Sequence, residues 1–357
     1  MQVRHAALIV AFCFTTDLGA QKKDPYKKVD NDVRLDALRH AQVWMQDDIA
    51  AKNLRLGPQV GSSFGPDAVV TCDYVEKKQT GTPKFDCAIS PDDEIRVKYG
   101  EQNGEIYSEV AATRLLWALG FGADRVYPVK VVCKGCPADP MKSHKKAEGS
   151  REFAAAVVER KMPGDVIELR KDSGWAWVEL TFVDQTNGGA PLAHRDALKL
   201  LAAMIQHTDN KPQQQRLVCL DKTHGLQPQQ DGSCEHTFMM INDLGKTFGR
   251  ATMGNGDKES AVNFKAWSNT PIWKDAKACV ADLSRSFTGS LEHPKISEDG
   301  RKFLSGLLAQ LSDQQLRDLF EAARFTKRDP ASADDWVSAF KQKRDEIASA
   351  HCANPVL

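Results

Sequence analysis

Two short segments in the middle of the chain carry residue types that can do acid–base and metal chemistry. The first, HTDNKPQQ at 207–214, contains Asp209, Lys211 and Gln214. The second, INDLG, contains Asp243 and follows an apolar run. A carboxylate can take a proton from a hydroxyl or hold a divalent cation, and a lysine can neutralise an anion. Each segment alone is also typical of an ordinary turn, so their order and separation carry the hypothesis of a shared site.

Together the two segments resemble the catalytic loop and the metal-binding loop of protein-kinase-like phosphotransferases. The resemblance implies that Asp209 orients or deprotonates an acceptor hydroxyl and that Lys211 neutralises the transferred phosphoryl group. It also implies that Asp243 binds Mg or Mn, with Gln214 as a second metal ligand. Kinases usually have Asn at the place of Gln214, and the longer side chain of Gln shifts that ligand. The implied cofactors are ATP, or another nucleotide, and a divalent metal.

The same resemblance assigns earlier residues to nucleotide binding. Lys98, in an expected strand, takes the place of the lysine that contacts nucleotide phosphates, and Glu109 on the next helix can hold it. The segment VVERKMPG resembles the hinge whose backbone meets adenine, with Glu159 to Met162 nearest. The alternative is that Lys98 and Glu109 are ordinary solvated charges.

The turn that would cover the phosphates differs from a glycine-rich loop. Between Cys72 and Cys87 the single glycine is Gly81. Lysines and threonines surround it: Lys77, Lys78, Thr80, Thr82 and Lys84. Such side chains can replace part of a backbone phosphate cradle. The alternative is an exposed, disulfide-braced hairpin that binds no ligand.

The composition fits a large folded chain without a general affinity for polyanions. With 357 residues, 41% hydrophobic and 27% charged, the chain can bury a substantial core. Lys plus Arg and Asp plus Glu both number 48, so no net positive field attracts nucleic acid or an anionic membrane. We expect no nucleic-acid partner and no stable membrane span. The expected partners are a nucleotide and an unidentified hydroxyl acceptor, which is a protein, a glycan or a small molecule.

The first twenty residues have the pattern of an export signal. Arg4 and His5 precede an apolar run over 6–14, and small residues at 18–20 offer a cleavage site. The run is short for a membrane span, and a buried first helix is the other alternative. We therefore expect a secreted or periplasmic protein.

Without Cys13, which lies in that segment, eight cysteines remain, an even number that fits an oxidising compartment. Cys72 and Cys87 flank the turn of an expected hairpin, which would bring them face to face across two strands. Cys219 and Cys234 bracket a polar loop that a disulfide can close. These two pairs are predicted from local spacing.

The other four cysteines are less defined. Cys133 and Cys136, in CKGC, can form a small structural disulfide, a redox pair or half of a metal site. No second C-x-x-C completes a zinc ribbon. Cys279 and Cys352 are left to pair by elimination.

Hydrophobic periodicity predicts an α+β chain in which strands come first and helices last. The expected strands cover 69–75, 84–89, 94–100, 125–133 and 153–164. The expected helices cover 30–53, 105–121 and 196–207, and the rest is mostly helical, with a capping box at Ser312 and Gln315. This order resembles the two-lobed kinase-like plan, with a small antiparallel-sheet lobe that carries one helix and a larger helical lobe.

We divide the chain accordingly into a signal peptide (1–20), an N-terminal helical extension (21–57), an N-lobe (58–164) and a helical C-lobe (165–357). Trp175 and Trp177 either line the cleft between the lobes or pack in the core. Aromatic residues at helical intervals in the tail are expected in the core.

The sequence therefore favours an exported atypical kinase-like phosphotransferase, similar to HipA-like, phosphatidylinositol-kinase-like and secretory-pathway kinases. The competing hypothesis is an exported pseudokinase that acts as a disulfide-braced binding or scaffold module. Gln214 and the glycine-poor turn favour this second hypothesis. A weaker alternative is a thiol–disulfide oxidoreductase built on Cys133 and Cys136.

Overall fold

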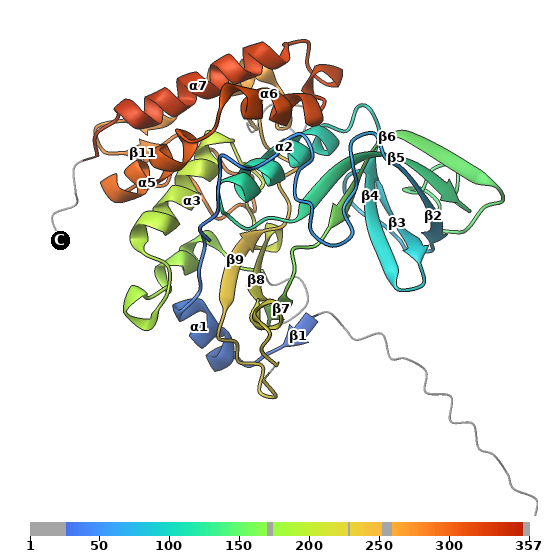
Figure 1. The fold of residues 1–357 in the computed structure, drawn as a ribbon, viewed down its shortest axis with the longest axis horizontal. Helices are drawn as coiled ribbons and strands as arrows, with labels where there is room; N and C mark the ends of the chain where they lie inside the picture. The colour runs from blue at the N-terminus through green and yellow to red at the C-terminus, as the bar shows by residue number, and fades with distance from the viewer. Residues whose placement is uncertain (1–25, 170–173, 228, 252–258, 353–357) are drawn as a thin grey trace, which may run out of the picture.

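The computed structural model describes residues 26–169, 174–227, 229–251 and 259–352, and the signal peptide expected at 1–20 lies outside them. The fold mixes strands and helices (Figure 1). The strands are β1 (Tyr26–Lys28), β2 (Val69–Val75), β3 (Lys84–Ser90), β4 (Asp93–Tyr99), β5 (Arg125–Lys134), β6 (Ser150–Arg160), β7 (Asp165–Glu168), β8 (Gln215–Cys219), β9 (Thr237–Ile241), β10 (Trp273–Asp275) and β11 (Val280–Ala281). The α-helices are α1 (Asn31–Arg39), α2 (Glu105–Ala118), α3 (Leu192–Met204), α4 (Phe264–Ser268), α5 (Glu298–Leu308), α6 (Asp313–Ala322) and α7 (Ala333–Ser349).

Strands β2 to β6 form a closed barrel in the order β2-β3-β4-β6-β5. The predicted antiparallel pairing of β2, β3 and β4 is confirmed. The sequence did not reveal that β2 also pairs in parallel with β5, with Cys72 opposite Cys133. Residues such as Val70, Phe85 and Val97 are buried in one apolar cluster that fills the barrel. A five-stranded barrel with one parallel pair therefore takes the place of the expected antiparallel sheet.

The helix α2 lies beside the barrel, between it and the other helices (Figure 1). It is buried on nearly every side, although it contains charged and hydroxyl residues as well as apolar ones. Its polar side chains are therefore enclosed too. Arg114 Nη1 donates to the carbonyl oxygens of Leu54 and Arg55, at 2.8 and 2.7 Å. The carboxylates of Glu105 and Glu109 reach a lysine of β4, which is the start of the candidate site.

Four other strands form a second sheet in the order β1-β7-β8-β9. The expectation of a mostly helical remainder is thus corrected, because an apolar run as short as β9 cannot be distinguished from a buried helix by its pattern. This sheet positions both chemistry-bearing segments. β8 begins directly after Gln214, and β9 ends two residues before Asp243.

The helix expected over 30–53 is wrong beyond its first turns. It ends at Arg39, and the chain then runs extended between two backbones, with Gln42 bonded to Thr237 and Met45 to Gly120. The backbone N–H groups of Gln42 and Met45 thus bond to carbonyl oxygens of neighbouring segments and not to a helical turn, which the helical periodicity of the sequence could not reveal.

The described helices α3, α5, α6 and α7 pack around a large apolar core. The tryptophans of the tail are buried there, as predicted: Trp267, Trp273 and Trp336. Trp175 and Trp177 are also buried, with ring centroids 5.1 Å apart, so they belong to the core and do not line a cleft. The predicted capping box at Ser312 and Gln315 is present.

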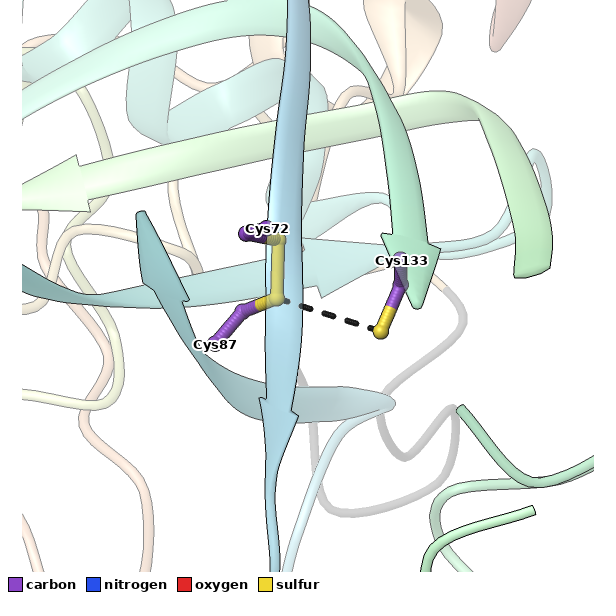
Figure 2. Close-up of side chains that lie close together, drawn as sticks. All are labelled: Cys72, Cys87 and Cys133. Atoms are coloured by element: carbon purple, nitrogen blue, oxygen red, sulfur yellow. Dashed lines mark hydrogen bonds between the residues drawn. A yellow bond between two sulfur atoms is a disulfide. The ribbon is translucent and has the colours of Figure 1, made fainter. Parts of the chain in front are cut away.

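All eight described cysteines are in disulfides: Cys72–Cys87, Cys133–Cys136, Cys219–Cys234 and Cys279–Cys352. Figure 2 shows the first bond lying against Cys133, with Cys87 Sγ and Cys133 Sγ 3.8 Å apart. Cys133 and Cys136 are 0% and 4% exposed, so the structural alternative for CKGC fits best. Within the described ranges, no helix has the length and hydropathy needed to cross a membrane.

Candidate functional site

A buried lysine surrounded by carboxylates forms the centre of the site. Lys98 on β4 is 3% exposed, and its ammonium is paired with Glu109 of α2. Glu105 Oε2 and Asp243 Oδ2 each lie 3.8 Å from Lys98 Nζ. The predicted contact between Lys98 and Glu109 is therefore present, and the alternative that both are solvated charges is wrong. Asp243 reaches the same lysine from the end of β9.

Three carboxylates share one lysine, and their charges and burial shift the pKa values of the groups in this cluster. Burial opposes the charge of Lys98, but Asp243, Glu109 and Glu105 together raise its pKa well above the ordinary value. Burial raises the pKa of Glu109, although Lys98 opposes this. Burial likewise opposes ionisation of Asp243, but Lys98 and the N–H of Gly245 hold its pKa well below the usual range. Asp243 is thus held in its ionised form, and its side chain is 31% exposed.

Asp209 lies in the loop between α3 and β8 and is held by three side chains. Lys211 Nζ donates to both of its oxygens, at 3.1 and 2.9 Å. Gln214 Nε2 donates to Oδ2 at 2.9 Å, and Ser286 Oγ donates to Oδ1 at 3.4 Å. The sequence placed the first two near Asp209 but gave no signal for Ser286, which is 77 residues away.

Gln214 also joins this loop to the Asp243 loop. Its backbone oxygen accepts from the N–H groups of Asn242 and Asp243, at 2.9 and 3.3 Å. The two segments singled out in the sequence are therefore held in one place. The side-chain amide of Gln214, expected at a metal, has its nitrogen turned to Asp209.

His207, two residues before Asp209, is enclosed by the fold. His207 is 1% exposed, and neither ring nitrogen has a hydrogen-bond partner among the described residues. Burial lowers its pKa to about 4, although Asp209 and Asp243 oppose this. His207 is therefore a neutral packing residue at ordinary pH, beside the indole of Trp177.

The turn between β2 and β3 closes over the lysine cluster. Thr82 Oγ1 donates to Glu105 Oε2 at 2.8 Å, and Lys84 Nζ lies close to Gly81, 3.9 Å from where a β-carbon would stand. Burial and the nearby Lys98 lower the pKa of Lys84. A cavity of about 360 Å³ opens beside this turn, lined in part by Thr82, Glu105 and Lys246. The turn thus has side-chain contacts with the site, unlike a hairpin that stands alone.

The predicted hinge covers the last two residues of β6 and the two that follow, and its side chains contact one another and Asp124. Glu159 pairs with Lys161, whose ammonium also lies 3.0 Å from Asp124 Oδ2. The N–H of Met162 donates to Asp124 Oδ1 at 2.8 Å. Burial opposes the charge of Glu159, but Lys161 and Lys98 lower its pKa to about 2. The sequence gave no signal for Asp124, which is 37 residues from Lys161.

The donor set at Asp243 fits a hard divalent cation. An ionised and partly exposed carboxylate is the ligand that Mg or Mn prefers, and one or two carboxylates suffice when phosphates supply the other oxygens. The side-chain oxygen of neighbouring Asn242 is buried without a hydrogen-bond partner in the described residues. Asp243 can therefore hold such an ion.

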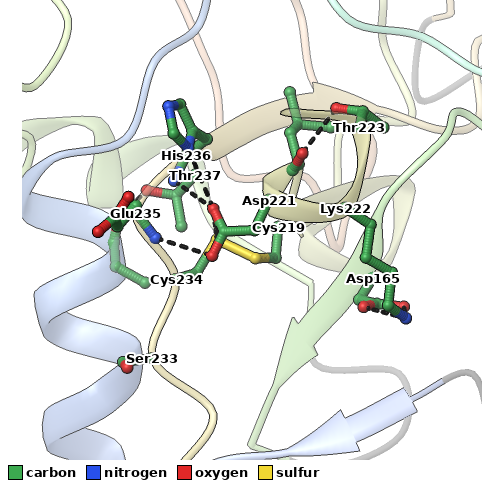
Figure 3. The surroundings of a disulfide bond; sticks show 12 residues. Asp165, Cys219, Asp221, Lys222, Thr223, Ser233, Cys234, Glu235, His236 and Thr237 are labelled. Atoms are coloured by element: carbon green, nitrogen blue, oxygen red, sulfur yellow. Dashed lines mark hydrogen bonds and ion pairs between the residues drawn. A yellow bond between two sulfur atoms is a disulfide. The ribbon is translucent and has the colours of Figure 1, made fainter. Parts of the chain in front are cut away.

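Another group of potential metal ligands consists of Cys219, Asp221 and Cys234 (Figure 3). Both sulfurs are in a disulfide, and Asp221 beside them accepts from the backbone N–H groups of Glu235 and His236, at 3.1 and 2.8 Å. Burial opposes ionisation, but these N–H donors lower the pKa of Asp221. This carboxylate braces the loop and leaves no thiolate for a metal.

Neither a protein family nor a curated protein sequence matches the chain. Among solved structures, it is similar to a proinflammatory kinase, CtkA, of Helicobacter pylori, with a TM-score of 0.41 and 11% identity. That match covers 80% of this chain and 95% of the other.

Proposed function

We propose that the protein is a two-lobed, atypical kinase-like phosphotransferase that binds ATP or another nucleotide with a divalent metal. The observation that carries this proposal is the convergence of Lys98, Glu109 and Asp243. A buried lysine, oriented by a helix carboxylate and facing an ionised aspartate, is the arrangement that positions nucleotide phosphates and their metal. Stability alone does not explain this arrangement, because a buried ion pair is seldom more stabilising than apolar packing.

Each residue of the candidate site has a distinct role in this proposal. Lys98 binds the phosphates, and Glu109 orients it. Asp243 holds the Mg or Mn ion, which neutralises phosphate charge when bound. Asp209 orients the acceptor hydroxyl and receives its proton, while Lys211 places positive charge beside the transferred group. Gln214 fixes Asp209 against the Asp243 loop.

The nucleotide base is assigned to the segment from Glu159 to Met162. The hydrogen bond from the Met162 N–H to Asp124 leaves that donor unavailable to a base, so the contacts to phosphate carry most of the binding in this proposal. The four disulfides support a further part of it, namely that the protein is secreted or periplasmic. The acceptor remains a hydroxyl of a protein, a glycan or a small molecule.

A pseudokinase is the second candidate, and one observation favours it. Asp209 is already engaged by Lys211, Gln214 and Ser286, so an external hydroxyl must displace a contact to reach it. In that case the cleft binds nucleotide without transfer.

The deciding experiment measures the melting temperature of the oxidised protein with and without ATP plus Mg or Mn. Ligand at 100 times its dissociation constant adds about 2.7 kcal/mol to the free energy of unfolding. We expect a shift in the wild type and none in Lys98→Ala or Asp243→Ala. If a folded wild type shows no shift with either metal, the nucleotide proposal fails. If it shifts but releases no ADP, the pseudokinase is the better description.

A further inference from the structure

The loop 286–291 is held against the Asp209 loop by hydrogen bonds from both of its ends. The N–H of Ser286 donates to the Thr208 carbonyl at 2.8 Å. The N–H groups of Ser290 and Leu291 both donate to Asn210 Oδ1 at 2.8 Å. The amide nitrogen of Asn210, which is fully buried, returns a bond to the Leu291 carbonyl at 2.9 Å. The loop therefore has a fixed place on the candidate site.

This attachment brings one hydroxyl of the loop to Asp209. Ser286 Oγ is the only side-chain hydroxyl in the described residues with a hydrogen bond to that carboxylate, at 3.4 Å. Lys211 and Gln214 occupy the remaining positions around it. A hydroxyl that donates to the proposed general base stands where an acceptor hydroxyl must stand before transfer.

The surroundings of Ser286 also permit it to react. Ser286 is only partly buried, and its neighbours Phe287 and Thr288 are exposed, with Phe287 at 99%. The γ-phosphoryl group can therefore be accommodated without opening a core. Lys211 supplies positive charge beside the position that the new phosphate monoester would take.

We propose that Ser286 is an internal phosphoryl acceptor, so that the enzyme phosphorylates its own loop in cis. This inference rests on the proposed function, since it needs a bound nucleoside triphosphate. In the step, Ser286 Oγ forms a bond to the γ-phosphorus, and the bond from that phosphorus to the β–γ bridging oxygen breaks. ADP leaves with the electron pair, and the hydroxyl proton passes to Asp209.

The test incubates the full oxidised chain with ATP and Mg or Mn and follows covalent phosphate by intact-mass and peptide mass spectrometry. We expect one phosphoryl group on Ser286 at a rate per molecule that does not change over a tenfold range of protein concentration. Ser286→Ala should lose it, and Ser286→Thr should restore part of it. Thr288→Ala is the matched control, because it removes an exposed hydroxyl two residues away, and it should incorporate phosphate as the wild type does.

Two results would overturn the inference while leaving nucleotide binding intact. One is phosphate at other residues, with Ser286→Ala as active as the wild type. The other is a wild type whose melting temperature rises with ATP and metal but which never carries phosphate on Ser286. A wild type without any nucleotide-induced shift instead removes the proposed function itself, and the inference with it.

Discussion

At the level of single residues, substitutions of Lys98 and Glu109 can distinguish a role in ligand binding from a role in stability. Glu109→Ala removes the closest partner of a buried ammonium and leaves it with two carboxylates at 3.8 Å. Loss of one partner of a buried pair costs about 3 kcal/mol, so we expect a loss of that order in urea unfolding. The double variant Lys98→Met/Glu109→Leu should recover most of it, because apolar packing can replace a buried pair.

The same double variant should show no melting-temperature shift with ATP and metal. Recovered stability without recovered binding would mean that the charges serve the ligand. A double variant that still shifts as the wild type does would contradict the role of Lys98.

His207 should make the protein sensitive to mild acid. Its folded pKa of about 4 lies below the ordinary value of 6.5, so the unfolded chain takes up a proton first as the pH falls. The stability that depends on neutral His207 is complete above pH 6.5 and is lost between 6.5 and 4, by about 3 kcal/mol. Measured over that window by urea unfolding, His207→Gln should lose less stability than the wild type. Equal slopes for the two proteins would show that His207 is not the group responsible.

At the scale of elements, sequence pattern was reliable where neighbours in sequence also pair in space. The hairpins of β2, β3 and β4 and the helix α2 followed from local periodicity. The contact of Lys98 with Glu109 was expected from the resemblance to kinase-like folds. The parallel pairing of β2 with β5 joins residues about sixty positions apart, and no local pattern records it. Asp124 and Ser286 were missed for the same reason, because each meets its partner through the fold.

The two disulfides of the barrel should be able to exchange. Cys136→Ser leaves Cys133 as a thiol 3.8 Å from Cys87 Sγ, and attack of its thiolate there would release Cys72. We expect alkylation under denaturing, acid-quenched conditions to label both Cys133 and Cys72. The matched control is Cys279→Ser, which should label only Cys352, because no other disulfide lies close to it in the described residues. Label confined to Cys133 in the first variant would contradict exchange.

At the scale of the whole molecule, the disulfides should stabilise in proportion to the chain that they close. Cys279–Cys352 spans 73 residues and Cys219–Cys234 spans 15. Removing the first by double alanine substitution should cost about 4 kcal/mol, and removing the second about 3 kcal/mol, by loop entropy alone. Denaturant unfolding of the two double variants measures the order. A larger loss for the short loop would mean that native contacts, such as those of Asp221, outweigh the entropy.

The pairing of β1 with β7 has a consequence for how the protein is made. β1 is the edge strand of its sheet, and its parallel partner lies about 140 residues further along the chain. During synthesis, β1 therefore has no partner until residue 168 has left the ribosome, and even then the sheet is incomplete without β8. The first described strand therefore cannot pair with its neighbour until nearly half of the 357 residues have been translated.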